Sequence, residues 1–268
     1  MKTLPIIILL TTLFVAACGP NKQELAKERF NRAEQLFNQK KFNDAKLEID
    51  SIEDLYPNQI EYVTRGNDLL RKITIEEQRQ NLVFLDSMLQ VKQAELKPLM
   101  KNFTESSDYG TKKILIHKRQ KPENSYGRTY LRAHLDLEGN FYISSRYTGT
   151  ERIYHDQIKV YFSGNSVLSE EIAEDGFNNR HFEDGENQWE VVSYKDGTDN
   201  GVVDFIANNA DKSLKVQFRG KKYFYIVMEK FDKEAIRDGY EISFVLKEIK
   251  RIEEEIDKVK AELGRLNA

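Results

Sequence analysis

Residues 170–186 hold the densest group of side chains that could bind a metal ion or transfer protons. Seven carboxylates occur there together with His181. Carboxylate and imidazole groups are common metal ligands, and a pair of carboxylates can hydrolyse a glycosidic bond. Their spacing matches no ligand motif, so the sequence favours a solvated acidic loop, with a β-sandwich hydrolase as an alternative. The carboxylates are those of Glu170, Glu171, Glu174, Asp175, Glu183, Asp184 and Glu186.

A second acidic segment, from Asp196 to Gly201, is similar to the start of a calcium-binding loop. Asp196, Asp199 and Asn200 could supply oxygen ligands close to two glycines. The EF-hand pattern, however, needs an acidic residue at the position where this chain has Ala207. The segment therefore predicts a hairpin turn and no bound metal.

The other three histidines lie far apart in the sequence. His117, His134 and His155 are separated by 17 and 21 residues, and each falls on a different predicted strand or turn. No nucleophile stands beside them in a recognisable motif, and the chain has no glycine-rich phosphate loop, nucleophile elbow or His-Glu-x-x-His sequence. We therefore expect no catalytic residue and no cofactor, and a protein that is not an enzyme.

Aromatic side chains are the remaining candidates for ligand binding. Trp189, Tyr194, Tyr147 and Tyr154 lie in the part of the chain that is rich in strand patterns. Exposed rings of this kind stack on sugars or anchor a partner protein. The alternative is that they form cross-strand pairs that cover a sheet face.

The N-terminal segment has the organisation of a secretory signal. A short positive start that contains Lys2 is followed by an apolar run over residues 4–15, which is too short to span a bilayer. The run ends in Val15-Ala16-Ala17-Cys18, an aliphatic residue and two small ones before a cysteine. This pattern resembles the lipobox of bacterial lipoproteins.

The lipobox resemblance implies that residues 1–17 are removed between Ala17 and Cys18. It also implies that the Cys18 thiol carries diacylglycerol and that the new N-terminus receives a further acyl chain such as palmitate. Two or three acyl chains give stable membrane attachment. Gly19 is not the aspartate associated with inner-membrane retention, and residues 20–24 contain one acid, so we expect an outer-membrane lipoprotein facing the periplasm. The alternative is an ordinary signal peptide that is cut near Cys18.

Composition limits the remaining functions. The 268 residues carry a net charge of −3, which gives no overall attraction for nucleic acid. Cys18 is the only cysteine, so the chain can form no internal disulfide and no multi-cysteine zinc site.

Residues 24–65, which follow a linker over residues 18–23, are predicted to form a helical hairpin. Apolar residues recur every three or four positions, and almost no glycine interrupts them. The short polar junction around residues 38–44 separates two helices, the second of which Asn43 or Asp44 could cap. The pattern resembles a single tetratricopeptide repeat, which implies contact with another protein. The residues that carry this resemblance are Ala33, Leu36, Phe42, Ala45, Ile49 and Pro57.

Two longer helices are predicted over residues 66–103 and 233–268, each with an apolar seam. We expect residues 66–103 and 233–266 to form an antiparallel coiled coil, because neither seam would be stable alone. A homo-oligomeric coiled coil is the alternative. The seams consist of Ile75, Leu82, Leu85, Leu89, Leu96 and Leu99, and of Ile242, Val245, Ile249, Ile252, Ile256, Val259, Leu263 and Leu266.

The intervening residues 104–232 are predicted to form an all-β head domain. Apolar residues alternate in three runs, and glycine-containing turns separate the runs. The expected fold is therefore α+β, with a helical hairpin, a coiled-coil stalk and an inserted sandwich or jelly roll, or else a small barrel. The alternating runs are Leu131, Ala133, Leu135 and Leu137; Ile158, Val160 and Phe162; and Leu214, Val216 and Phe218.

These features together predict a lipid-anchored interaction or scaffold protein of the cell envelope. The expected partners are the membrane, through lipid on Cys18, and a protein of the envelope. A surface glycan-binding lipoprotein is the alternative, and a β-sandwich hydrolase is the second alternative.

Overall fold

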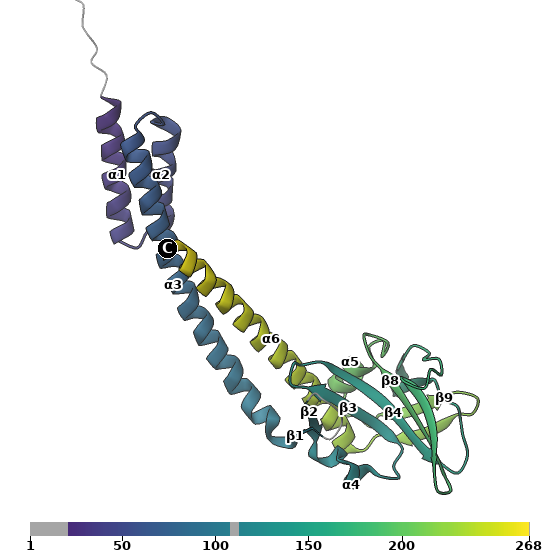
Figure 1. Ribbon diagram of the computed structural model, residues 1–268. Helices are drawn as coiled ribbons and strands as arrows, with labels where there is room; N and C mark the ends of the chain where they lie inside the picture. Colours follow the sequence, from purple (N-terminus) through teal and green to yellow (C-terminus); the bar gives the residue numbers. More distant parts are fainter. Residues whose placement is uncertain (1–20, 108–112, 268) are drawn as a thin grey trace, which may run out of the picture. The chain divides into compact units, whose positions relative to one another are not determined.

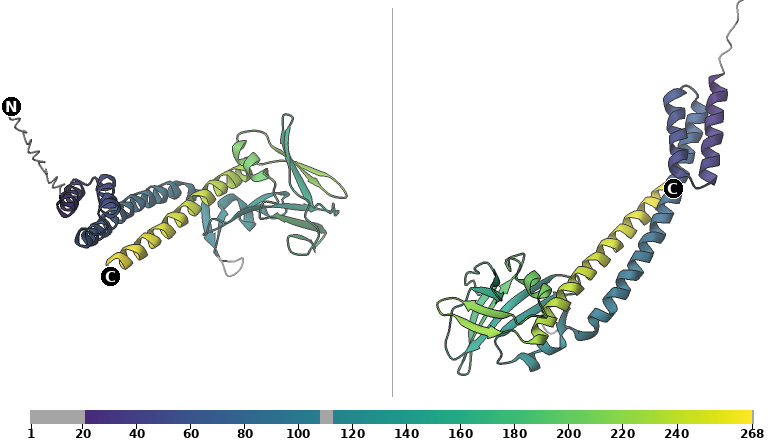
Figure 2. Two further views of the ribbon diagram at one scale, coloured as in Figure 1. Left: turned by 90° about the horizontal axis from the view of Figure 1, so that it is seen from above. Right: turned by 180° about the vertical axis from the view of Figure 1, so that it is seen from behind.

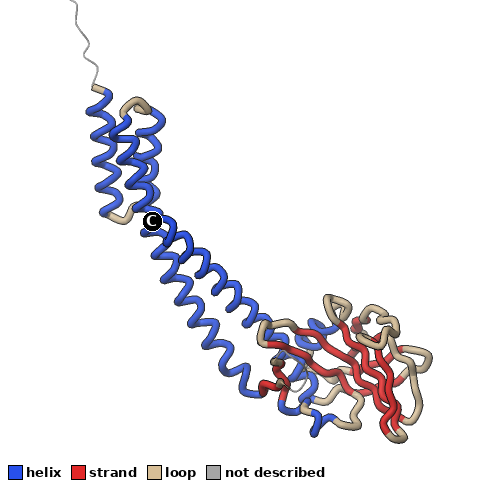
Figure 3. Tube along the Cα trace, in the orientation of Figure 1, coloured by secondary structure: helices blue, strands red, loops and turns tan. Residues whose placement is uncertain are grey.

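The computed structural model describes residues 21–107 and 113–267, in which helices and antiparallel sheets are combined (Figure 1, Figure 3). A long helical region comes first, and the sheets lie in the C-terminal part of the sequence. The predicted α+β class is confirmed at this level. The chain divides into two compact units, residues 1–82 with 259–268, and residues 83–258.

The first unit has a helical core. It is built from α1 (Lys22–Asn38), α2 (Phe42–Leu55) and the first part of α3 (Ile60–Leu99). Ala33 and Ala45 are fully buried, so the backbones of α1 and α2 can approach closely. The predicted helical hairpin is therefore present, and its relationship to tetratricopeptide repeats stays a prediction.

One detail of this hairpin differs from expectation. Helix α2 already begins at Phe42, and its N-terminus has no side-chain cap, so Asn43 and Asp44 lie inside the first turn. Helix α3 is continuous through Gly66. A Cβ atom at Gly66 would lie 3.2 Å from the Ile49 side chain, so the glycine lets α2 pack closely against α3.

Helix α3 runs antiparallel to the C-terminal helix α6 (Lys230–Asn267) (Figure 2). In the first unit, the Arg71 Nε atom donates a hydrogen bond to the Leu266 carbonyl oxygen. In the second unit, Leu99 packs in a cluster that contains Ile242. Two predicted seam residues, Leu99 and Ile242, therefore share one apolar cluster, and the coiled coil itself stays a prediction.

Two antiparallel sheets form most of the second unit. The six-stranded sheet has the order β1-β2-β3-β4-β8-β7, and the four-stranded sheet has the order β10-β9-β5-β6. The strands are β1 (Phe103–Ser106), β2 (Ile114–His117), β3 (Tyr130–Asp136), β4 (Phe141–Gly149), β5 (Gln157–Phe162), β6 (Asn165–Leu168), β7 (Asn179–Asp184), β8 (Asn187–Tyr194), β9 (Lys215–Arg219) and β10 (Phe224–Val227). The shorter helical pieces are a 3-10 turn (Met100–Asn102), a second 3-10 turn (Lys118–Gln120), α4 (Pro122–Ser125) and α5 (Val202–Asn208).

One apolar core holds the second unit together. Alternate residues of the central strands point into it, as the alternation of Leu131 and Ala133 predicts, and Leu135 packs in a smaller cluster with Ile242. Residues of both sheets, α5 and the start of α6 share this core. Since alternate side chains of a strand point to opposite faces, the other residues of β3, β4 and β8 face outward.

Two local predictions for this unit are wrong. Leu137 does not continue the buried alternation, because β3 ends at Asp136 and Leu137 is 40% exposed in the following turn. The segment around Asp199 is not a hairpin turn, because it leads from β8 into α5. The Asp199 carboxylate accepts a hydrogen bond from the Val203 amide in the first turn of α5.

Candidate functional site

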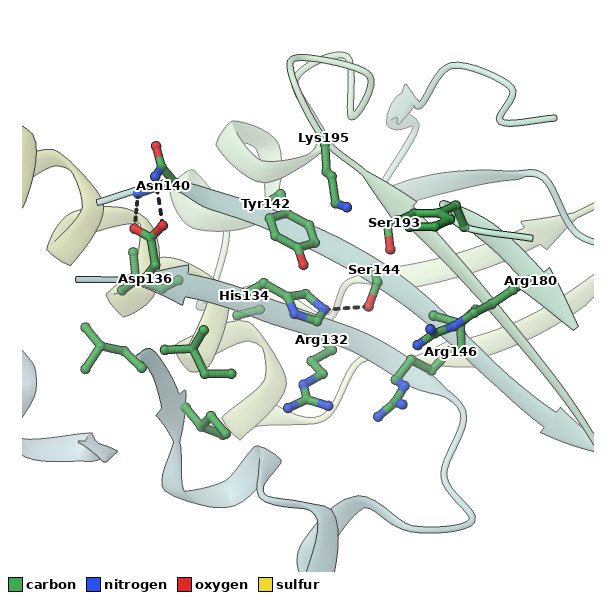
Figure 4. A pocket seen from close by; sticks show the side chains of 17 residues that line it. Arg132, His134, Asp136, Asn140, Tyr142, Ser144, Arg146, Arg180, Ser193 and Lys195 are labelled. Carbon is green, nitrogen blue, oxygen red and sulfur yellow. Dashed lines mark hydrogen bonds between the residues drawn. The ribbon is translucent and has the colours of Figure 1, made fainter. Parts of the chain in front are cut away.

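The outward face of the six-stranded sheet carries a cavity of about 400 Å³, which we call the outer groove (Figure 4). It lies over β2, β3, β4, β8 and β7. The residues that line it are Ile114, Leu115, Ile116, Arg132, Ala133, His134, Leu135, Asp136, Asn140, Tyr142, Ser144, Arg146, Phe177, Arg180, Val191, Ser193 and Lys195.

Positive charge dominates the outer groove. Of the described residues, four cationic side chains and one carboxylate, that of Asp136, line it. Asp136 is already engaged, because it accepts hydrogen bonds from the backbone amides of Glu138 and Asn140 and from the Asn140 side chain. The cations are Arg132, Arg146, Arg180 and Lys195.

Three of these cations have no carboxylate partner among the described residues. Arg146, Arg180 and Lys195 form no salt bridge there. The Arg146 guanidinium reaches the Tyr130 hydroxyl at 3.4 Å, and the Lys195 ammonium lies 5.1 Å from the centre of the Tyr142 ring. Charges of one sign that share a cavity repel one another, so the groove favours an anionic ligand that would neutralise them.

His134 and Tyr142 form a flat ring pair in the groove. Their ring centroids are 4.4 Å apart and the ring planes differ by 1°. The His134 Nε2 atom lies 2.8 Å from the Ser144 Oγ atom. Burial lowers the pKa of His134 well below its ordinary value, and the neighbouring arginine and lysine charges lower this pKa further. The imidazole is therefore neutral at neutral pH.

A second cavity of about 230 Å³, the aromatic pocket, adjoins the outer groove. Phe182 and Trp189 stack there with centroids 5.9 Å apart, and the Tyr126 ring lies 5.5 Å from that of Trp189. The Tyr126 hydroxyl donates a hydrogen bond to Asp184. Arg132 and Arg146 line both cavities, which makes the two cavities neighbours on one face of the sheet. The aromatic pocket is lined by Pro122, Ser125, Tyr126, Arg132, Arg146, Phe182, Asp184 and Trp189.

Of the four aromatic residues proposed for ligand binding, one lies at the aromatic pocket on the outward face of the sheet. Trp189 lines the aromatic pocket, although only 6% of its surface is exposed. Tyr147 and Tyr194 belong to the apolar core, so the expectation that they offer exposed rings is wrong. They lie on the inward side of β4 and β8. Tyr154 is 37% exposed but packs edge-on against His181 away from both cavities.

The acidic stretch serves local structure. Asp175 accepts hydrogen bonds from the backbone amides of three following residues, and Glu183 forms a salt bridge with Arg152. His181 lies 3.2 Å from the exposed Glu174 carboxylate. Within residues 21–107 and 113–267, no three histidine, cysteine or carboxylate side chains are grouped so that they could hold a metal ion.

A buried Ser–His–Glu chain inside the core has no counterpart in the sequence-based prediction. The His155 imidazole lies 2.8 Å from Ser145 Oγ and 2.7 Å from a Glu190 carboxylate oxygen. All three residues are fully buried, so Ser145 is not accessible to a substrate. Glu190 also accepts hydrogen bonds from the backbone amides of Ile153, Tyr154 and His155. These hydrogen bonds therefore hold the loop that precedes β5 against strand β8.

Ionisation within this buried chain is well defined. Burial alone would raise the pKa of Glu190, but the hydrogen bonds from His155 and from the loop amides lower this pKa below its ordinary value. Burial lowers the pKa of His155 and outweighs the opposing effect of Glu190. The neutral His155 imidazole therefore donates a hydrogen bond to the charged Glu190 carboxylate.

Cys18 and Ala17 lie outside the described residues, so lipidation and signal cleavage stay predictions. Among the described helices, none combines the length and the hydrophobicity needed to cross a bilayer. No protein-family model matches the chain, and no curated protein or solved structure shows significant similarity to it.

We predict that Glu190→Gln lowers the free energy of unfolding of the second unit by about 3 kcal/mol, because the buried loop amides lose a charged acceptor. Urea unfolding followed by the emission of Trp189, the only tryptophan, measures this change. The exposed Glu171→Gln serves as the control and should change stability by less than about 0.5 kcal/mol. Equal stability of the two variants would contradict the structural role of Glu190.

We also predict that the second unit loses stability as the pH falls below 6.5. Burial lowers the pKa values of His117, His134 and His155 from their ordinary value of 6.5. Below that pH the unfolded chain binds more protons than the folded chain. Each histidine therefore lowers the free energy of unfolding by at most about 1.4 kcal/mol for each pH unit. Above pH 7 this contribution is complete and constant.

Urea unfolding at pH 7.5 and at pH 5.5 tests this expectation. His134→Gln removes one titrating group and should reduce the difference between the two pH values. Undiminished stability at pH 5.5 would show that these histidines are not held neutral.

Proposed function

We propose that this protein is a lipid-anchored binding protein of the bacterial cell envelope that holds an acidic ligand on the outward face of its six-stranded sheet. The observation that carries the proposal is the outer groove, in which Arg146, Arg180 and Lys195 have no carboxylate partner among the described residues. Although the chain has a net charge of −3, four cationic side chains and one carboxylate of the described residues line this cavity. Such local concentration is typical of sites for anionic ligands.

The anchor in this proposal is lipid on Cys18. The lipobox sequence Val15-Ala16-Ala17-Cys18 supports this anchor. Residue 19 is glycine and not aspartate, which favours attachment to the outer membrane. We place the protein on the periplasmic side of that membrane. The acyl chains, palmitate among them, would hold the chain there.

The proposal includes a stalk and a head. We propose that residues 66–103 and 233–266 form an antiparallel coiled coil, which the apolar cluster that includes Leu99 and Ile242 supports. Outside that helix pair, the two sheets would form a β-sandwich head, which the core shared by Leu131 and Val160 supports. Binding to a protein partner through the head remains part of this proposal, provided that the partner presents acidic groups.

Hydrolysis is the second candidate function, and the Ser144–His134 pair in the outer groove is its best support. A general base, however, must accept a proton and become cationic during the reaction. Burial of His134 lowers its pKa, the surrounding arginine and lysine charges lower this pKa further, and both effects oppose that step. Binding is therefore the function that the electrostatics of the groove favour.

We predict that phosphate, citrate or glucuronate raises the unfolding temperature of the purified full-length protein in low salt. The double variant Arg146→Gln/Arg180→Gln should lose this response, because two of the groove cations are removed. Lys215→Gln, which removes an exposed cation from β9 on the other sheet, should keep it. If none of the three anions changes the unfolding temperature, the groove is not an anion site and the proposal fails.

For the anchor, we predict that Cys18→Ala abolishes labelling by a palmitate analogue in growing cells and moves the protein out of the membrane fraction. Gly19→Ala is the matched control, because it changes a neighbouring residue and leaves the cysteine in place. Unchanged labelling and membrane association of Cys18→Ala would contradict lipid attachment at this residue.

A further inference from the structure

The strand register arranges the outward side chains in rows across the sheet. At one end, the His134 and Tyr142 rings stand opposite each other, and at the other end Trp189 stands opposite Phe182. Two rows with cationic side chains lie between these ring pairs. They are Arg132, Ser144 and Ser193, followed by Arg146, Val191 and Arg180.

The two ring pairs are well separated along β4. Tyr142 belongs to the first pair, and Trp189 of the second pair stands opposite Thr148, six residues further along the strand. A strand rises about 3.4 Å per residue, so the ring pairs lie about 20 Å apart along it. This length exceeds that of a single sugar ring or a single small anion.

We infer that the outer groove and the aromatic pocket together bind an acidic oligosaccharide. Its sugar rings stack on the aromatic pairs, and its carboxylates bind the guanidinium groups of Arg146 and Arg180 between them. Arginine recognises carboxylates through paired hydrogen bonds, and flat aromatic faces provide apolar contact area beside polar groups. This inference rests on the proposed function, which requires only an acidic ligand.

The accessible rings are suited to such stacking. Phe182 and Tyr126 are 41% and 70% exposed, whereas Trp189 is 6% exposed and lies against both of them. Phe182 and Tyr126 therefore provide the contact surface, and Trp189 supports them from within. Ser193 and the partly exposed Tyr142 supply hydroxyl groups at the edge of the groove for the hydrogen bonds that sugars form.

An acidic peptide fits this surface less well than an oligosaccharide. Peptides that bind sheets usually add a strand to an open edge. The groove lies instead on the face of β3, β4 and β8, which are interior strands with neighbours on both sides. A small anion alone would leave both aromatic pairs unused.

Calorimetry with tetragalacturonate as the probe tests the inference on the purified full-length protein. We expect tetragalacturonate to bind at least about tenfold more tightly than galacturonate, because only the longer ligand contacts an aromatic pair and the neighbouring arginines together. Its methyl ester, which has the same length without the charges, should bind at least about tenfold more weakly. Binding should also change the emission of Trp189, since the tryptophan lies in the aromatic pocket.

Single variants separate the contributions of charge and stacking. Arg180→Gln should weaken binding of tetragalacturonate about tenfold. Phe182→Ala should weaken the binding of tetragalacturonate. It should leave the affinity for galacturonate unchanged, because the cationic side chains remain. Lys215→Gln should leave both affinities unchanged. Unfolding curves of each variant confirm that the fold is intact.

Equal affinity for the tetramer and the monomer would overturn the inference and leave the groove as a site for single anions. The same conclusion follows if phosphate or citrate binds but tetragalacturonate does not. Tight binding of the methyl ester would overturn it as well, because charge would then have no role. If no anion of any kind binds, the inference and the proposed function both fail.

Discussion

The opposite orientation of successive side chains along β3, β4 and β8 is the constraint on which both the fold and the groove depend. Leu131, Ile143 and Val192 point inward and share a core with the second sheet. Their neighbours in sequence must therefore point outward. Because Arg132, Ser144 and Ser193 are such neighbours and stand in register, the same packing that closes the core also assembles the groove.

Electrostatics distinguish the outward face of the sheet from the core. The outer groove holds positive charges, and the Asp136 carboxylate in its lining is occupied by the turn between β3 and β4. Burial, together with these charges, lowers the pKa of the neighbouring His134, so the ring pair with Tyr142 adds no further cation. Inside the core the arrangement is the reverse, because the charged Glu190 is surrounded by donors that compensate it fully. One sheet thus carries a compensated buried charge on one face and, on the other, three cations (Arg146, Arg180 and Lys195) without a carboxylate partner among the described residues.

Much of the fold could be predicted from local patterns, since apolar spacing alone marks the helices and the buried strands. The alternation of Leu131 with Ala133 identifies the inward face of β3 correctly. The same alternation, carried from Ile143 to Tyr147 and from Val192 to Tyr194, places both tyrosines inside the core and was the available signal against choosing them as ligand residues.

The groove itself could not be predicted in the same way. Its cations come from β3, β4 and β7 and from the end of β8, and only the pairing register brings them together. Register between distant strands depends on packing of the whole sheet, which a single sequence does not display. The buried Glu190 escaped notice for a related reason, because its hydrogen-bond donors lie more than thirty residues away in the chain.

The most direct measurement of the central claim is an amide NMR titration of the protein with tetragalacturonate. The account predicts shifts confined to the outward rows of the six-stranded sheet, with Ser144, Arg180 and Ser193 among the amides most affected. It also predicts that the amides of β5 and β9 in the other sheet remain unchanged. Shifts centred on β5 and β9, or no shifts at any ligand concentration, would contradict it.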